Sequence, residues 1–303
     1  MTEEAAAISA RPIRLTVERE GMEGSVQHFW HYMFGYLLPT VDHHLAHAAD
    51  RRRYVLESCG PVMDAVTREC LSCLGVDFVI AAADEIARQH AAAEEVLLEH
   101  WDRFTQDPQF RQELRSRLDR VVPALKAAIP NRCGCGADVA LAGRILLLER
   151  SAMPNFYAPG GPAEIPSYGR ARRYLTNLVE VCAQMQARGY PVAIYEPGGH
   201  SVGCQIAVFS KVRGVAGIEG AEFANLIWAP EGTRVYLLRP PGFVIPFQQC
   251  LSECMNMPYR QDNCPGVIEP LDRYALQDFF AGMGKPTLGD RIVASFRRWT
   301  ARA

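Results

Sequence analysis

The sequence predicts an α/β protein with a Rossmann-like domain in its second half. Strand-like and helix-like segments alternate strictly after residue 144, which is typical of a parallel sheet whose strands are joined by helical crossovers. A loop at residues 129–143, rich in glycine and other loop formers, separates this unit from the chain before it. Since 303 residues are enough for two modest domains, we expect a first domain at residues 1–135 and a second at residues 136–303.

The first half is expected to form short strands that alternate with amphipathic helices. Residues 26–49 carry apolar side chains at helical spacing, and Pro39 should kink or split this segment. A proline begins the helix expected at Pro61–Cys73, and Pro130 follows the long helix expected at residues 107–129. The candidate strands of this half are residues 13–18, Tyr54–Glu57, and residues 76–82 and 95–99.

The second half alternates more regularly. Its expected helices are residues 170–188, residues 202–210 and Ala221–Trp228. The strands around them are expected at residues 145–149, Val192–Tyr195, and residues 212–218 and 234–238. The tail adds expected helices around residues 246–255, 272–282 and 290–302. In such a sheet the carboxyl ends of all strands meet at one edge, and ligands bind outside that edge.

The composition is that of an ordinary globular protein. Hydrophobic residues make up 49% of the chain and charged residues 22%, and the net charge of −2 gives no reason to expect a nucleic-acid partner. The apolar runs are too short to cross a bilayer, and the acidic N-terminal segment does not resemble a secretory signal. The ten cysteines are therefore interpreted as intracellular thiols, with the cytoplasm as the expected compartment.

The segment at residues 212–228 carries the strongest local signal for a ligand. A strand-like run stops at small residues, and a helix-like run then begins. The backbone N–H groups at such a helix start, together with the helix dipole, favour an anion and typically a phosphate. Gly217, Gly220, Ala221 and Asn225 are therefore candidates for holding a diphosphate and its nucleoside. The alternative is a tight turn that needs small residues only for packing.

Four segments of the second half resemble glycosyltransferase family 61. They are a strand that ends in arginine (RILLLER), a helix with arginine and asparagine (RARRYLTNLVEV), a glutamine-containing helix (CQIAVFSKV) and the segment GIEGAEFANLIWAPEGTRVYLL. The N-terminal QHFWHYMFGYLLP and the tail MNMPYRQDNCPGVIEPLDRYALQDFF fit the family more loosely. The likeness is to bacterial members of the capsular-polysaccharide type.

This resemblance implies a GT-B architecture, in which two Rossmann-like domains face each other across a cleft. The first domain would hold the acceptor, and the second would hold a nucleotide-sugar donor and carry a helical tail. The reaction would be an inverting sugar transfer to a glycan or glycoconjugate, in surface polysaccharide synthesis. The resemblance also implies that no metal bound by an Asp-x-Asp motif is needed, and the chain has no such motif, so neither a cofactor nor a metal is expected. Neither nucleic acid nor a transmembrane segment is expected, and peripheral membrane association is left open.

Further positions match the donor-binding pattern of the family. Arg150 ends a strand at the carboxyl edge of the sheet, where its guanidinium could donate two hydrogen bonds to a phosphate. Arg172 and Arg173 lie in a basic run whose alternative is a solvated helix face. Asn177 and Gln205 match by position, and either could instead satisfy a loop.

Three residues are candidates for the catalytic base. His31 matches the N-terminal histidine of the family and shares a helix face with His28, although a core or stacking role is its alternative. The acidic residue that the family often has four positions later is Gly35 here, and the hallmark histidine is Glu219. Glu219 and Asp42 are therefore candidate carboxylates. A carboxylate beside a diphosphate is repulsive unless it is neutralised or accepts a hydrogen bond from a sugar hydroxyl.

These departures keep a second hypothesis open, a non-catalytic binding or assembly protein on a degenerate glycosyltransferase scaffold. Another kind of nucleotide-binding enzyme is disfavoured because the chain has no Gly-x-Gly-x-x-Gly or Walker segment. Two groups have spacings that only weakly suggest a metal. They are His43, His44 and His47, and Cys133 and Cys135 with Cys250, Cys254 and Cys264.

Overall fold

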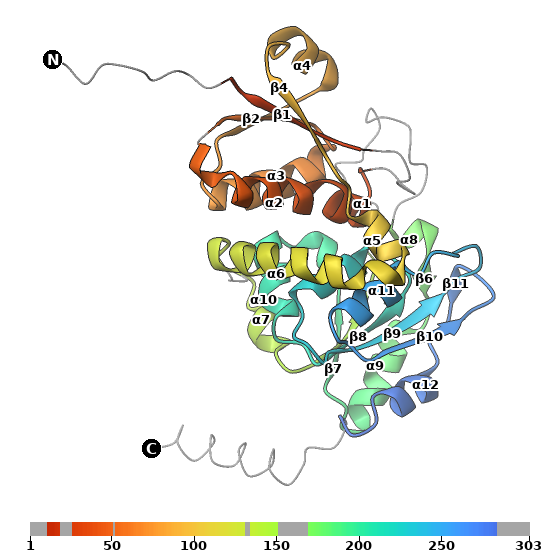
Figure 1. The fold of residues 1–303 in the computed structure, drawn as a ribbon. Helices are drawn as coiled ribbons and strands as arrows, with labels where there is room; N and C mark the ends of the chain where they lie inside the picture. Colours follow the sequence, from red (N-terminus) through yellow and green to blue (C-terminus); the bar gives the residue numbers. More distant parts are fainter. Residues whose placement is uncertain (1–10, 19–25, 51, 131–133, 151–168, 284–303) are drawn as a thin grey trace, which may run out of the picture.

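The computed structural model describes residues 11–18, 26–50, 52–130, 134–150 and 169–283. In these ranges the two halves of the sequence form two separate sheets, which lie one above the other with helices between them (Figure 1). Every strand pair in both sheets is parallel. The predicted α/β class with parallel sheets is therefore confirmed.

The first sheet has four strands in the order β3-β2-β1-β4. They are β1 (Ile13–Val17), β2 (Tyr54–Glu57), β3 (Phe78–Ala81) and β4 (Glu94–Leu98). All four overlap the predicted strands, because each carries apolar residues in a short run or in alternation with polar ones.

The helices of the first half agree with the prediction in most places. The segment expected at residues 26–49 is divided into α1 (Phe29–Tyr32), the π-helical turn η1 (Met33–Leu37) and α2 (Leu38–Ala46), with Pro39 in the first turn of α2. The chain continues with η2 (Ala48–Asp50), α3 (Pro61–Cys73), α4 (Ala83–Gln89), α5 (Asp102–Gln106), η3 (Pro108–Phe110) and α6 (Arg111–Ala128). The short helices α4 and α5 were not predicted.

The second sheet has five strands in the order β10-β9-β8-β5-β7. They are β5 (Ile145–Leu148), β7 (Val192–Tyr195), β8 (Gly214–Ile218), β9 (Arg234–Arg239) and β10 (Tyr259–Asn263). The sequence did not predict β10, because Tyr-Arg-Gln-Asp-Asn has no apolar alternation. A polar strand of this kind is tolerated because it lies at the edge of the sheet.

The single helix predicted at residues 170–188 is wrong. This stretch forms α8 (Gly169–Arg172), the two-residue strand β6 (Tyr174–Leu175) and α9 (Leu178–Ala187). The strand β6 pairs with β11 (Ile268–Glu269). Its backbone groups therefore bond to a strand that is distant in the sequence, instead of forming the hydrogen bonds of a continuous helix. The other helices of this half are α7 (Ala137–Ala140), η5 (Pro197–Gly199), α10 (Val202–Phe209), η6 (Ala221–Trp228), α11 (Phe247–Cys254) and α12 (Arg273–Phe279). The terminal helix predicted at residues 290–302 lies outside the described residues.

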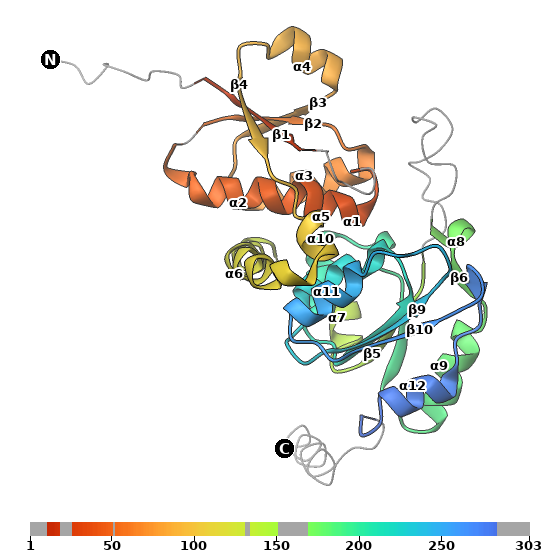
Figure 2. The same ribbon diagram turned by 45° about the vertical axis from the view of Figure 1, so that its right-hand side comes forward.

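Both faces of the second sheet are covered. In β5, Ile145 and Leu147 pack into one core with α9 and α12, whereas Leu146 and Leu148 pack into another with α10 and η6. Figure 2 shows α9 and α12 on the side of this sheet that faces away from the first half. This alternation follows from the two-residue repeat of a strand, and it explains why β5 is apolar throughout.

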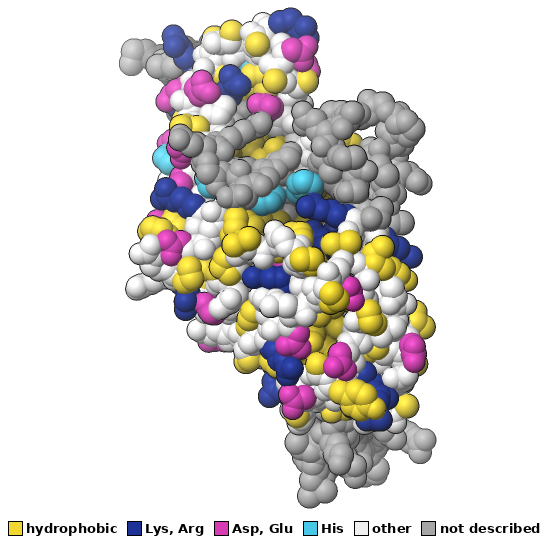
Figure 3. Space-filling view, turned by 90° about the vertical axis from the view of Figure 1, so that its right-hand side faces the viewer, with side chains coloured by type: hydrophobic (Ala, Val, Ile, Leu, Met, Phe, Trp, Pro, Cys, Tyr) yellow, Lys and Arg dark blue, Asp and Glu magenta, His cyan; other side chains and the backbone are white. Residues whose placement is uncertain are grey.

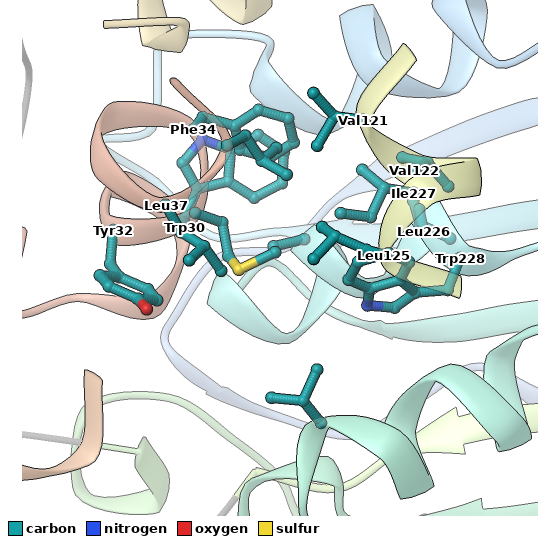
Figure 4. Packing of buried hydrophobic residues seen from close by; sticks show 14 of the residues in the cluster. Trp30, Tyr32, Phe34, Leu37, Val121, Val122, Leu125, Leu226, Ile227 and Trp228 are labelled. Atoms are coloured by element: carbon teal, nitrogen blue, oxygen red, sulfur yellow. The ribbon is translucent and has the colours of Figure 1, made fainter. Parts of the chain in front are cut away.

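The two halves share one hydrophobic core. Trp30 and Phe34 from the first helical segment, Leu125 from α6 and Trp228 from η6 belong to a single buried cluster (Figure 4). The helix α6 contacts both α2 and η6, so it bridges the two sheets. The boundary predicted between residues 135 and 136 falls between the last strand of one sheet and the first of the other, and its exact place stays a prediction.

The order of the strands marks where a ligand should bind. The strand β5 lies between β7 and β8, so the chain first leaves β5 on one side and later returns to its other side. The crevice outside the carboxyl ends at such a switch point is the usual ligand site of a doubly wound sheet. In the first sheet β1 lies between β2 and β4 in the same way. No helix within the described ranges is both long and apolar enough to cross a bilayer.

Candidate active site

A cavity of about 250 Å³ lies between the two halves. The first half lines it with side chains from α1 and α3, and the second half with residues that follow the carboxyl ends of β5, β7, β8 and β9. Figure 3 shows histidine side chains next to Lys or Arg side chains near this waist of the molecule. The cavity therefore lies at the switch point that the strand order marks in the second sheet.

Arginines form the wall contributed by the second half. Arg150, which follows β5, is 8% exposed, and its Nη1 donates to the backbone oxygen of Glu219 at 3.3 Å and pairs with Glu222 at 3.2 Å. Arg173 is also buried, and its guanidinium lies 4.4 Å from the centre of the Phe243 ring. Burial, followed by repulsion from Arg150 and Arg172, lowers the pKa of Arg173 to about 9. This concentration of positive charge favours an anionic ligand.

Gly220 permits Arg150 to reach its place. A Cβ atom at residue 220 would lie 2.0 Å from Nη1 of Arg150 and 2.3 Å from the Glu222 carboxylate, so any larger residue would displace this ion pair. The 3₁₀ helix η6 begins directly after Gly220, and no side chain caps it. Its first N–H groups therefore border the cavity at Gly220 and Ala221, as an anion site at a helix start requires.

Glu219 is neutralised within the protein. Its side chain is 2% exposed, and Nε of Arg239 donates to its carboxylate at 2.8 Å. Burial raises the pKa of Glu219, and the charge of Arg239 opposes that rise. The partner comes from the neighbouring strand, because Glu219 follows β8 and Arg239 ends β9. The repulsion expected between this carboxylate and a diphosphate is thereby reduced.

Histidines of the first half form the opposite wall, and a buried carboxylate behind them holds His31. His31 on α1 makes a short hydrogen bond through Nδ1 to Asp102, which is fully buried in the first turn of α5. His28 lies beside them, and burial, followed by the nearby His31 and the arginines Arg172 and Arg173, lowers its pKa to about 4. The histidines of the first half thus lie within electrostatic reach of the arginines of the second half.

The other predicted donor residues lie partly in this cavity. Gln205, Ala221 and Asn225 line it. The amide of Gln205 donates to the backbone oxygen of His200 at 2.9 Å, and the amide of Asn225 accepts from Trp228 Nε1 at 3.1 Å. Their polar atoms are thus held in place by the protein itself.

Three predicted residues do not line the cavity. Asp42 makes a two-fold hydrogen bond to Arg120 at 2.9 and 3.0 Å, and Asn177 bonds both backbone groups of Leu271. Gly217 lies under η6, where a Cβ atom would be 3.2 Å from Cβ of Leu148, so the packing alternative describes it.

Several residues that line the cavity or support its lining were not singled out from the sequence. Asp102 is 71 positions away from His31, and no local motif joins them. The signal that could have found it is its place just after the end of β4, which corresponds to the place of Arg150 after β5. The other residues of this kind are His200, Glu222, Phe243 and Phe247.

Neither metal group considered from the sequence appears as a cluster among the described residues, and Cys133 of the second group lies outside them. His43 and His47 stack on each other at 4.2 Å between ring centres, but they join no cluster of three metal-binding side chains. The thiols of Cys250 and Cys254 donate to the backbone oxygens of Phe104 and Arg111, which identifies them as packing residues of α11. The cluster that the described residues do contain is Cys135, His200 and Cys204.

Fold and site together define an α/β protein with an arginine-lined cavity between two parallel sheets. The family model for glycosyltransferase 61 matches residues 29–236, which is more than half of the chain. The chain therefore belongs to glycosyltransferase family 61 and is a glycosyltransferase. The matched region contains His31, Asp102, Arg150, Arg173 and Glu219. A comparison with curated proteins finds no match.

Proposed function

We propose that this glycosyltransferase moves a sugar from a nucleotide-sugar donor to a hydroxyl group of a glycan or glycoconjugate, with inversion at the anomeric carbon. The observation that carries the proposal is the composition of the cavity. Its second-half wall presents arginines at a switch point, and its first-half wall presents a histidine held by a buried carboxylate. We further propose that the two halves act as the two domains of a GT-B enzyme, with the donor in the second half.

The arginine wall suits the diphosphate of the donor. When the bond to the sugar breaks, negative charge develops on the leaving phosphate. Arg150, Arg173 and the N–H groups after Gly220 border the place where that charge would lie. These fixed positive groups can stabilise the departing diphosphate, and we propose that no metal takes part in this step. Gln205 and Asn225 would border the donor on the same wall.

The histidine wall suits the acceptor. Because Nδ1 of His31 donates to Asp102, its Nε2 is left as the basic nitrogen. In the proposed reaction Nε2 takes the proton of the acceptor hydroxyl while the oxygen attacks the anomeric carbon and the bond to the diphosphate breaks. A single displacement of this kind inverts the anomeric centre. Asp102 is a positioning residue that fixes the tautomer of His31.

Glu219 takes a different part in this scheme. Its ion pair with Arg239 leaves it less suited to remove a proton than His31, but a carboxylate oxygen at the cavity can accept a hydrogen bond from a sugar hydroxyl. We propose that Glu219 contacts a hydroxyl of the donor or the acceptor. Asp42 has no part in the scheme, because it lies outside the cavity. An acceptor in a surface polysaccharide rests on the sequence resemblance alone.

The proposal is tested with a panel of nucleoside diphosphates and nucleotide-sugars. A true donor should raise the unfolding temperature, because a ligand at 100 times its dissociation constant stabilises the folded state by about 2.7 kcal/mol. The best donor is then incubated with an oligosaccharide panel, and nuclear magnetic resonance reads the anomeric configuration of the product. Rates with and without added Mg²⁺ should agree. A panel without any stabilising nucleotide, or a product with retained configuration, would overturn the proposal.

A further inference from the structure

Cys135, His200 and Cys204 come together beside the cavity. Nδ1 of His200 lies 3.6 Å from Sγ of Cys204 and 3.9 Å from Sγ of Cys135. All three ligand atoms lie within 4.8 Å of one another. Cys204 is buried and His200 is partly buried, while Cys135 is exposed. The three side chains come from the loop before α7 and from the start of α10, which are 65 residues apart.

The two nitrogen–sulfur separations are close to the edges of a metal tetrahedron. Zinc binds thiolate sulfur at about 2.3 Å and imidazole nitrogen at about 2.0–2.1 Å, so neighbouring ligands of tetrahedral zinc lie roughly 3.5–3.8 Å apart. Two thiolates and an imidazole are soft to intermediate ligands, which favour zinc over magnesium or calcium. We propose that Cys135, His200 and Cys204 bind Zn²⁺ and supply three of its four ligands.

The site exists in the reduced protein. Cys204 takes part in a disulfide in the structure, so its sulfur can bind zinc only after reduction. A dithiol reductant supplies two electrons and two protons to the disulfide and is itself oxidised to a disulfide, which releases Cys204 as a thiol. Zinc then displaces one proton from each of the two thiols of the site, Cys135 and Cys204. The sulfur of Cys204 can therefore be in the disulfide or bind zinc, but not both at once.

The surroundings of His200 are already ordered without a metal. Its ring stacks on Tyr195 at 5.1 Å, and its backbone oxygen accepts from the amide of Gln205. Ser201 caps α10 by accepting from the N–H of Cys204. Contacts of this kind orient the ligands of a metal, so the imidazole of His200 is already held in place, and the main change that the site needs is reduction of the Cys204 disulfide. Zinc there would tie the loop before α7 to α10.

This role is structural rather than catalytic. His200 borders the cavity, but the two sulfurs of the cluster do not line it. The metal would therefore fix one wall of the donor site without touching the reacting atoms. The sequence led us to expect no metal, and the proposed site revises that expectation outside the reaction itself.

The full chain is purified in a dithiol reductant with zinc, dialysed into metal-free buffer that contains the reductant, and analysed by atomic absorption. We expect about one tightly held Zn²⁺ per chain in the wild type. Cys135→Ser, His200→Asn and Cys204→Ser should each lose most of it, whereas Cys73→Ser, which changes an exposed cysteine of α3, should keep it. With Co²⁺ in place of zinc, the wild type should show the visible bands of a tetrahedral site and thiolate-to-metal charge transfer, and the three site variants should not.

Two results would overturn the zinc site. One is a reduced wild type that holds no zinc after dialysis, and the other is zinc content in Cys135→Ser equal to that of the wild type. Because Cys135 is exposed, its serine variant should fold even if the His200 variant does not. Oxidation of the wild type with a disulfide should release the metal, and retention after complete oxidation also counts against the proposal. None of these measurements depends on sugar transfer, so they test the zinc site independently of the proposed function.

Discussion

The two sheets approach the shared cavity with the same geometry and different chemistry. In the second half, the buried Arg150 lies two residues after β5. The turn after β8 holds small residues next to the ion pair between Arg150 and Glu222. In the first half the turn after β4 leads to a buried aspartate that holds a histidine. One wall therefore concentrates positive charge, and the other presents a base with its proton position fixed.

This difference indicates how a repeated topology can serve two roles. In each sheet the first strand has a later strand on either side, which opens a crevice at the carboxyl edge. The topology positions the crevice, and the side chains that follow the strands determine which ligand it binds. The predictions below separate a loss of proton transfer in the first half from a loss of donor binding in the second.

The largest effect is expected from the histidine wall. Replacing His31 with Gln should lower kcat by about 10²–10⁴-fold, because the acceptor hydroxyl loses its base. The affinity for a nucleoside diphosphate, measured by calorimetry, should stay nearly unchanged. Equal losses of nucleotide affinity and of kcat would show that His31 belongs to the donor wall instead.

Asp102→Asn tests the positioning role of the aspartate. It should lower kcat less than His31→Gln does and leave nucleotide affinity nearly unchanged, because the imidazole loses only the acceptor that fixes its tautomer. A merely structural aspartate would lower the amount of active enzyme without lowering kcat per active site. Active-site titration with a tight nucleotide corrects for inactive protein.

The next largest effect is expected from Arg150. Arg150→Ala should weaken nucleotide-sugar binding by about 1.5–3 kcal/mol, since it removes a charge-assisted hydrogen bond to the diphosphate. Arg234→Ala is the matched control, because Arg234 begins β9 at the amino-terminal end of the same sheet and donates to the backbone oxygens of residues 279 and 281. Calorimetry measures the nucleotide-sugar affinity of both variants. Equal affinities for the two would remove Arg150 from the donor site.

Glu219→Gln should have a smaller and mixed effect. It leaves Arg239 buried without its charge partner, so the free energy of unfolding should fall by about 1–3 kcal/mol. Turnover should fall as well, while nucleotide affinity stays nearly unchanged. The double variant Glu219→Gln with Arg239→Gln should recover part of the stability. If turnover recovers together with stability, Glu219 acts only as a structural partner; if turnover stays low, it contacts a reacting sugar.

The smallest effect is a pH dependence of stability. The pKa of His28 falls from 6.5 to about 4 on folding, mainly through burial, so the unfolded chain takes up a proton first as the pH falls. Stability is therefore lost between pH 6.5 and about 4, by about 1–2 kcal/mol after allowance for solvent screening. His28→Asn should remove this part of the acid sensitivity, and His90→Asn should not. Urea unfolding at several pH values gives the comparison, and parallel curves for wild type and His28→Asn would contradict it.

The sequence alone determined the elements that are encoded locally. The helix at Pro61–Cys73 and the strands at Tyr54–Glu57 and Val192–Tyr195 have the predicted bounds, because apolar periodicity and flanking turn formers are properties of neighbouring residues. Arg150 could be placed at the cavity for the same reason, since a residue at the end of a parallel strand lies at the ligand edge of the sheet. The family, too, was recognised from segments of the sequence.

Only the tertiary structure decided which distant residues meet. Asp102 reaches His31 across 71 positions, Arg239 reaches Glu219 from the neighbouring strand, and the pairing of β6 with β11 interrupts a helix that local propensity favoured. Each of these contacts depends on how the crossovers place strands side by side, and no local pattern of side chains records that placement. The same holds for Cys135 and His200, whose spacing in the sequence gave no sign of a common site.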